Sequence, residues 1–217
     1  MKKTLLPAVI LLMFLSSTTF AQLPFKLGAR VGLNIANLSF SPDLPSAVDK
    51  SSRIGFKFGA AAELGFIPMF AVQIEPMYVM KGAKFSANGA EETFKYSYLE
   101  IPILLKLKIP TPGPVTPYAF AGPNIGIFLS GTDEYTGGSE DLKDFTSSVD
   151  FALDIGAGVS FDIAPFTSLL IDARYSLGLS NIFNDKGQLS WQQLTGQSSQ
   201  SVKTTGIQIV AGVMFGL

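Results

Sequence analysis

The sequence predicts an all-β protein, an eight-stranded antiparallel up-and-down transmembrane β-barrel. Three observations indicate this fold class: segments in which every second residue is apolar, connections that alternate between short and long, and an N-terminal export signal. A period of two is typical of a β-strand with two unlike faces. The 217 residues suffice for one such domain, which we place at residues 22–217.

The first 21 residues have the pattern of a secretory signal peptide. Lys2 and Lys3 form a basic start, residues 5–15 are almost wholly apolar, and residues 19–21 offer a small-x-small cleavage site. The alternative is a membrane anchor, but this apolar core is shorter than the roughly 20 residues that a spanning helix needs. The sequence contains no Cys, so neither a lipoprotein anchor nor a disulfide is expected.

The first predicted strand, residues 25–35, shows the alternation most clearly, because its odd-numbered residues are apolar and its even-numbered residues are Lys, Gly, Arg, Gly and Asn. Seven further segments repeat this pattern over lengths sufficient for a tilted span of the bilayer. They are residues 54–66, 70–80, 99–109, 115–129, 149–163, 169–179 and 207–217.

The fifth predicted strand, residues 115–129, is the least regular. Pro117 and Pro123 imply a bulge or an irregular start, because proline cannot donate to a strand ladder. Asn124 and the neighbouring glycines favour even-numbered residues facing inward, whereas Tyr118 and Phe120 fit either face. The facing of this strand therefore stays open at the level of sequence.

The predicted connections alternate in length. Tight turns are expected at residues 67–69, 110–114 and 164–167, and long connections at residues 37–52, 82–93, 131–148 and 181–203. Short periplasmic turns and long outer loops are typical of outer-membrane barrels. This asymmetry places both mature termini in the periplasm.

The apolar face of the strands is expected to contact lipid. A soluble lipocalin-like barrel would bury that face instead, but about fifty apolar side chains exceed what an eight-stranded interior can hold. Outward aromatic residues collect toward the strand ends, as interfacial girdles do, although aromatics are also simply favoured in strands. They are Phe25, Phe66, Phe70, Phe161 and Phe215 at one end and Phe56, Tyr78, Phe151 and Tyr175 toward the other.

The inward positions carry seven basic and seven acidic residues. In a narrow lumen these should pair, because an unpaired buried charge is costly; an ion or proton pathway, or an acid/base site, is the functional alternative. The predicted lumen charge network comprises Lys26, Arg30, Lys57, Glu63, Glu75, Lys81, Glu100, Lys106, Lys108, Asp150, Asp154, Asp162, Asp172 and Arg174.

Catalysis is not expected, because the sequence contains neither His nor Cys. That absence removes His-based triads, thiol chemistry and most zinc sites, and we predict no catalytic, cofactor-binding or metal-binding residue. The third long connection is acidic, so it is a candidate calcium-binding loop, but it lacks the ligand spacing of an EF-hand loop. A solvated loop is the favoured interpretation of Asp133, Glu134, Glu140, Asp141 and Asp144.

Several segments resemble the PorT-like porin family of outer-membrane β-barrels from Bacteroidota. They are residues 32–38 (GLNIANL), 73–78 (QIEPMY) with Lys81-Gly82, 98–106 (YLEIPILLK), Pro117-Tyr118 with residues 121–123, and Arg174-Tyr175 with Gly178-Leu179. The resemblance implies the barrel fold over nearly the whole mature chain. It implies little about activity, and the family name does not establish a pore.

We therefore expect a small non-enzymatic outer-membrane barrel with a side-chain-filled lumen and a structural or surface-interaction role. The alternative is a narrow channel or a small-ligand-binding barrel that uses the charged lumen. Outer-membrane lipid and the barrel assembly machinery are the expected partners, while the partner of the outer loops stays open. Cleavage of the signal leaves 14 basic against 17 acidic residues, a net charge of −3, which does not favour nucleic acid.

The signal peptide and the strand pattern together predict the location of the protein. The mature chain, beginning at Gln22, should fractionate with the outer membrane, resist carbonate extraction and migrate differently before and after boiling on a detergent gel. Recovery of the mature chain in the soluble periplasm would contradict the membrane interpretation.

Overall fold

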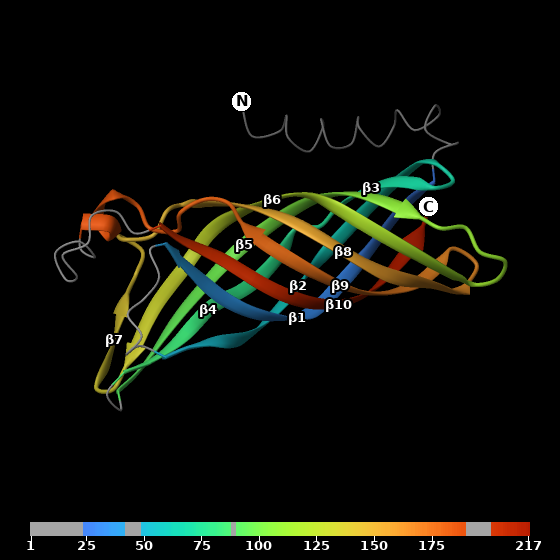
Figure 1. The fold of residues 1–217 in the computed structure, drawn as a ribbon. Helices are drawn as coiled ribbons and strands as arrows, with labels where there is room; N and C mark the ends of the chain where they lie inside the picture. The colour runs from blue at the N-terminus through green and yellow to red at the C-terminus, as the bar shows by residue number, and fades with distance from the viewer. Residues whose placement is uncertain (1–23, 42–48, 88–89, 190–200) are drawn as a thin grey trace, which may run out of the picture.

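The computed structural model describes residues 24–41, 49–87, 90–189 and 201–217, so the predicted signal peptide lies outside the described residues. Within them the chain forms ten β-strands (Figure 1). No helix in this part of the chain is long and apolar enough to span a membrane. The strands are β1 Phe25–Ser41, β2 Asp49–Ile67, β3 Phe70–Ile74, β4 Met77–Ala87, β5 Ala90–Lys108, β6 Val115–Tyr135, β7 Gly138–Asp141, β8 Val149–Ala164, β9 Thr167–Gly178 and β10 Ser201–Gly216.

The strands form one closed antiparallel ring. β1 pairs with β2, β5 with β6, β6 with β8, β8 with β9 and β9 with β10, while β3 and β4 each pair with β2 and β5. β1 pairs with β10 from Lys26–Gly216 to Ser41–Ser201 and closes the ring. Because β3 and β4 both lie between β2 and β5, they share one position in the ring. β7 adds no further position, because it only forms a short hairpin with the end of β6. The described strands therefore occupy eight positions in the ring, which confirms the predicted eight-stranded up-and-down barrel.

The third predicted strand is interrupted at Glu75-Pro76, between β3 and β4. Pro76 has no N–H to donate, but its carbonyl accepts a hydrogen bond from the Ala60 backbone N–H at 3.1 Å, and the Glu75 N–H donates to the Pro102 carbonyl at 3.1 Å. The interruption therefore leaves the ring closed, with neighbours β2 and β5 unchanged on either side of it.

The long connections are shorter than predicted, because strands continue into them. The hairpin of β4 and β5 pairs as far as Ala87–Ala90, and β5 pairs with β6 as far as Glu92–Tyr135. The outward residues of these extensions, such as Lys84 and Lys95, are polar. The apolar alternation that revealed the strands from sequence therefore stops before the strands themselves end. We call this end of the barrel the long-connection end and the other the tight-turn end.

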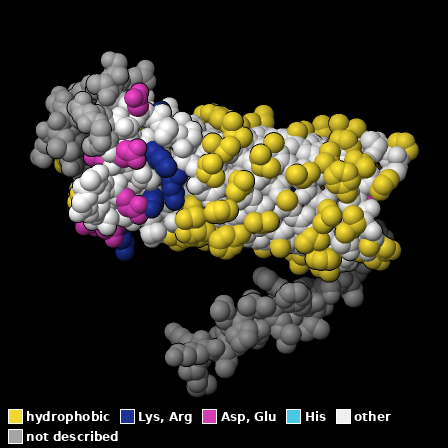
Figure 2. All heavy atoms as spheres, turned by 90° about the horizontal axis from the view of Figure 1, so that it is seen from below, with side chains coloured by type: hydrophobic (Ala, Val, Ile, Leu, Met, Phe, Trp, Pro, Cys, Tyr) yellow, Lys and Arg dark blue, Asp and Glu magenta, His cyan; other side chains and the backbone are white. Residues whose placement is uncertain are grey.

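The apolar face points outward, as predicted. Along β8, Leu153 and Ile155 are 41% and 56% exposed, whereas Asp154 between them is fully buried. Figure 2 shows this apolar surface as a broad band across the face of the barrel in view, with charged side chains gathered beyond it at the long-connection end. Several predicted girdle aromatics, including Phe66, Phe215 and Phe56, are exposed on this surface.

The structure also settles the facing of the fifth predicted strand, which is β6. Tyr118, Phe120 and Asn124 are buried in the lumen, whereas Ile127 and Leu129 are exposed. Even-numbered residues of β6 therefore face inward up to this point, and the two aromatic rings at 118 and 120 are part of the barrel interior.

The two faces predict opposite outcomes for arginine substitutions. Leu153→Arg and Ile103→Arg place a charge on the outward face, which costs about 2–4 kcal/mol near the bilayer midplane. Each variant should fold into lipid vesicles in lower yield and unfold at a lower urea concentration than the wild type. Ser160→Arg is the control, because Ser160 borders the lumen cavity at the tight-turn end. Harmless arginines at 153 and 103 combined with failed insertion at 160 would contradict the assigned facing.

Candidate functional site

The structure places the predicted lumen charges in two settings. Eleven of the fourteen are buried inside the barrel: Arg30, Lys57, Glu63, Glu75, Lys81, Glu100, Lys106, Asp150, Asp154, Asp172 and Arg174. The other three, Lys26, Lys108 and Asp162, lie at the tight-turn end, where Asp162 is exposed and joins Lys26 only through the hydroxyl of Ser168. The lumen set is therefore a buried network with a partly solvated rim.

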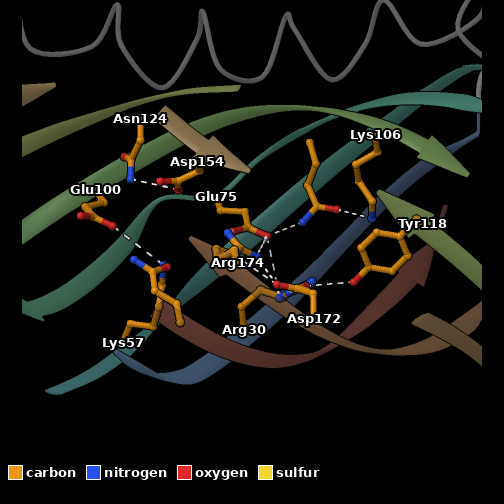
Figure 3. A network of polar contacts seen from close by, with 12 residues as sticks. Arg30, Lys57, Glu75, Glu100, Lys106, Tyr118, Asn124, Asp154, Asp172 and Arg174 are labelled. Atoms are coloured by element: carbon orange, nitrogen blue, oxygen red, sulfur yellow. Dashed lines mark hydrogen bonds and ion pairs between the residues drawn. The ribbon is translucent and has the colours of Figure 1, made fainter. Parts of the chain in front are cut away.

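Arg174 lies at the centre of the network (Figure 3). Its Nη1 is 2.7 Å from Glu75 Oε2, and its Nη2 is 2.7 Å from Asp172 Oδ1. Asp172 also pairs with Arg30 and accepts a hydrogen bond from the Tyr118 hydroxyl at 2.9 Å. A planar guanidinium suits such bridging of two carboxylates. This central cluster joins β1, β6, β9 and the β3–β4 junction.

A second group of contacts extends the network toward the tight-turn end. Glu63 accepts hydrogen bonds from Lys106 Nζ at 2.7 Å and from Lys108 Nζ at 2.6 Å. Lys106 also donates to Gln73 Oε1 at 2.7 Å, and Gln73 in turn donates to Glu75. These bonds connect Glu63 to the central cluster without a break.

A third group lies toward the long-connection end. Lys81 Nζ is 2.7 Å from Glu100 Oε1 and 3.3 Å from Asp150 Oδ2. Lys57 donates to Gln208 and lies 3.8 Å from Glu100 Oε2. Lys57 and Lys81 therefore share the carboxylate of Glu100, which is fully buried.

Asp154 departs from the expected pairing. It is fully buried, yet among the described residues no Lys or Arg nitrogen lies within 4 Å of its carboxyl oxygens. Asn124 Nδ2 donates to Asp154 Oδ2 at 3.1 Å instead (Figure 3). The expectation that every lumen acid has a basic partner is therefore wrong at this position, because a neutral amide occupies the place of a cation.

Aromatic rings complete the lumen, and the sequence alone did not assign them to it. Lys106 Nζ lies 4.1 Å from the centroid of the Tyr118 ring, and the Arg174 guanidinium lies 4.8 Å from that of Phe120. A Cβ atom at Gly156 would approach the Phe120 ring to 2.5 Å, and one at Gly158 would approach the Tyr118 ring to 2.8 Å. The glycines of β8 therefore make room for the rings of β6.

An apolar cluster closes the lumen at the long-connection end, and we call it the outer cap. Leu142 and Ile182 come from the connections after β7 and β9 and pack against strand residues that point inward. The bridge between Thr146 and Phe183 holds these two connections together. Single apolar residues in polar connections leave no periodic signal, so the sequence did not reveal the cap. Its buried members are Leu38, Ala83, Tyr96, Tyr98, Leu142, Ile182 and Val202.

The tight-turn end of the lumen is more open. A cavity of about 290 Å³ lies there, bordered by Lys26, Lys106, Lys108, Glu63 and Tyr118 among others. Its lining includes the Glu63–Lys106 pair, whose side chains are 5% and 3% exposed. Among the described residues, no group of three or more acidic side chains could hold a metal ion.

Comparisons with known proteins agree with this architecture. The family model described as "Outer membrane protein beta-barrel domain" matches residues 20–184, and the chain belongs to that family. Neisserial surface protein A is similar in structure, with a TM-score of 0.51 and 19% identity over 88% of this chain and 96% of that one. OprG from Pseudomonas aeruginosa is similar with a TM-score of 0.56 and 10% identity over 89% and 95%. No curated protein sequence matches the chain.

The central cluster predicts a large effect for Arg174→Ala. This change leaves Glu75 and Asp172 buried with fewer cations, which should cost about 3–5 kcal/mol of stability. Lys95→Ala is the matched control, because the Lys95–Glu134 pair is 38% and 48% exposed and such surface pairs contribute about 0–1 kcal/mol. Urea unfolding in detergent or lipid vesicles measures both. Equal losses in the two variants would show that the lumen pairs are screened by water.

Proposed function

We propose that this protein is a closed, non-enzymatic outer-membrane barrel whose role is structural or depends on its outer surface. The observation that carries this proposal is the burial of the central lumen. Lys57, Glu75 and Glu100 have 0% exposure, so water does not reach the middle of the barrel at the positions where a pore would have to be lined. An eight-stranded interior is just wide enough to be filled by side chains or to hold one small ligand, and here buried side chains occupy its centre.

The two ends of the lumen support the same proposal. The outer cap places tyrosine, leucine and isoleucine side chains across the long-connection end, and the ion-pair network lies beneath it. The cavity at the opposite end is bordered by the buried Glu63–Lys106 pair. A solute that entered from the tight-turn end would therefore meet the Glu63–Lys106 pair and not a passage to the other side.

We further propose the orientation and the route to the membrane. The eleven buried lumen charges form the plug of a barrel, and Lys26, Lys108 and Asp162 lie at its tight-turn end. The barrel is exported by a signal peptide at residues 1–21, with both mature termini in the periplasm. Outer-membrane lipid and the barrel assembly machinery are its partners, and nucleic acid is not. The segments at residues 73–78 and 98–106 favour a PorT-like porin family member.

Conductance tests the closed lumen. Purified wild-type protein in planar bilayers should show no steady ion current, and Arg174→Ala should lower the unfolding temperature without creating one while the outer cap remains in place. Heat-dependent migration on a detergent gel is the control that the barrel has folded. A steady current in the folded wild type, altered by Arg174→Ala without loss of stability, would contradict the closed lumen and support the channel alternative.

A further inference from the structure

A basic cavity lies on the wall of the barrel at the long-connection end. Its volume is about 520 Å³, and it spans β2, β4, β5 and the end of β6. Lys84 and Lys95 lie next in sequence to the buried residues Ala83 and Tyr96, so their own side chains point to the outside of the barrel. The residues that line the cavity are Ser52, Arg53, Ile54, Lys84, Thr93, Lys95 and Glu134.

The three cations of this cavity are held in different ways. Arg53 Nη1 donates to the Lys81 backbone carbonyl at 2.6 Å. The next residue, Gly82, has a positive φ of 140°, and a Cβ atom there would clash with the Phe94 carbonyl oxygen and lie 3.3 Å from Arg53 Cδ. Lys95 pairs with Glu134, the one acid among the lining residues. Lys84 is exposed and makes no ion pair within the described part of the chain. The cavity therefore carries an excess of positive charge.

The cavity borders the apolar band. Ile54, one of its lining residues, is 67% exposed and continues on β2 into Phe56 and Phe58, which are also exposed. The outward side chains of Tyr78 on β4 and Ser97 on β5 are joined by a hydrogen bond of 2.8 Å, and Ser97 lies two residues from Lys95 along β5. Figure 2 shows Lys and Arg side chains between the apolar band and the acidic side chains further out. Long basic side chains at such a border place their charge at the level of the lipid headgroups.

We propose that this cavity binds a phosphate group carried by a glycolipid of the outer leaflet. This inference rests on the membrane orientation proposed above. Lys84, Lys95 and Arg53 supply charge-assisted hydrogen-bond donors for a phosphate, and the hydroxyls of Ser52 and Thr93 supply neutral ones. The exposed apolar residues below the cavity contact the acyl chains of the same molecule. A free phosphate ion would contact only the basic residues of the cavity, whereas a phosphorylated lipid contacts both these residues and the exposed apolar residues beside them.

The test compares two double variants of the full mature barrel in lipid nanodiscs. Lys84→Gln with Lys95→Gln removes two cations from the cavity and keeps Arg53, because its guanidinium supports the backbone. Lys143→Gln with Lys186→Gln removes the same charge from exposed positions that do not line the cavity. Native mass spectrometry and fluorescence titration measure binding of a diphosphorylated lipid A and of its dephosphorylated counterpart.

The cavity variant should bind the phosphorylated lipid about tenfold or more weakly than the wild type, since each basic residue near a membrane surface contributes attraction to anionic lipid. The control variant should bind it like the wild type, and the dephosphorylated lipid should bind weakly to all three proteins. Equal affinity of the two double variants would overturn the proposal. So would displacement of the phosphorylated lipid by millimolar inorganic phosphate, because the site would then recognise the free ion.

Folding and conductance separate this inference from the proposed function. Both double variants should retain heat-dependent migration and remain non-conducting, because neither touches the lumen network. A conducting wild type with intact lipid selectivity would reject the closed lumen and leave the lipid site standing. A non-conducting wild type that binds the phosphorylated and the dephosphorylated lipid equally well would reject the lipid site and leave the closed lumen standing.

Discussion

The rest of this structure depends on the closure of the β-sheet. In the hydrocarbon region of a bilayer each backbone N–H and C=O must be satisfied within the protein, because no water is available to replace the bond. The pairing of β1 with β10 supplies this closure and removes the edges that an open sheet would expose. Even the proline at 76 conforms, because its carbonyl accepts a hydrogen bond from β2 although its nitrogen cannot donate one. Closure with eight positions also limits the interior to about the width of packed side chains.

That narrow interior explains the chemistry of the lumen. Charged groups that face inward cannot keep a full shell of water, so Arg174 and Arg30 share the carboxylates of Glu75 and Asp172. Glycine at 156 and 158 provides the room that the rings of Phe120 and Tyr118 require. A buried ion-pair network is weak evidence for net stability, because desolvation offsets much of the attraction. Its clearer consequence is that the middle of the barrel is filled.

The two ends of the barrel differ in a way that bears on function. The tight-turn end has a cavity lined by side chains of both charges, whereas the long-connection end closes the lumen with apolar side chains and continues the strands beyond the apolar band. On the face drawn in Figure 2, the surface at that end changes from apolar residues to Lys and Arg side chains and then to acidic side chains. A molecule that contacts the long-connection end would therefore meet the wall and the connections of the barrel and not its interior.

The sequence by itself determined the class of fold, because a period of two predicts strands with two unlike faces, and the apolar face carries more side chains than an eight-stranded interior can hold. Parity within the strands also predicted an inward position for the charged residues, and eleven of the fourteen are buried inside the barrel. The sequence could not show that the strands extend beyond the apolar band, because their outward residues there are polar like those of a loop. Nor could it show that Asp154 faces Asn124, or that Leu142 and Ile182 seal the lumen. Those contacts join distant parts of the chain, and only the register and the tilt of the closed sheet decide which side chains meet across its interior.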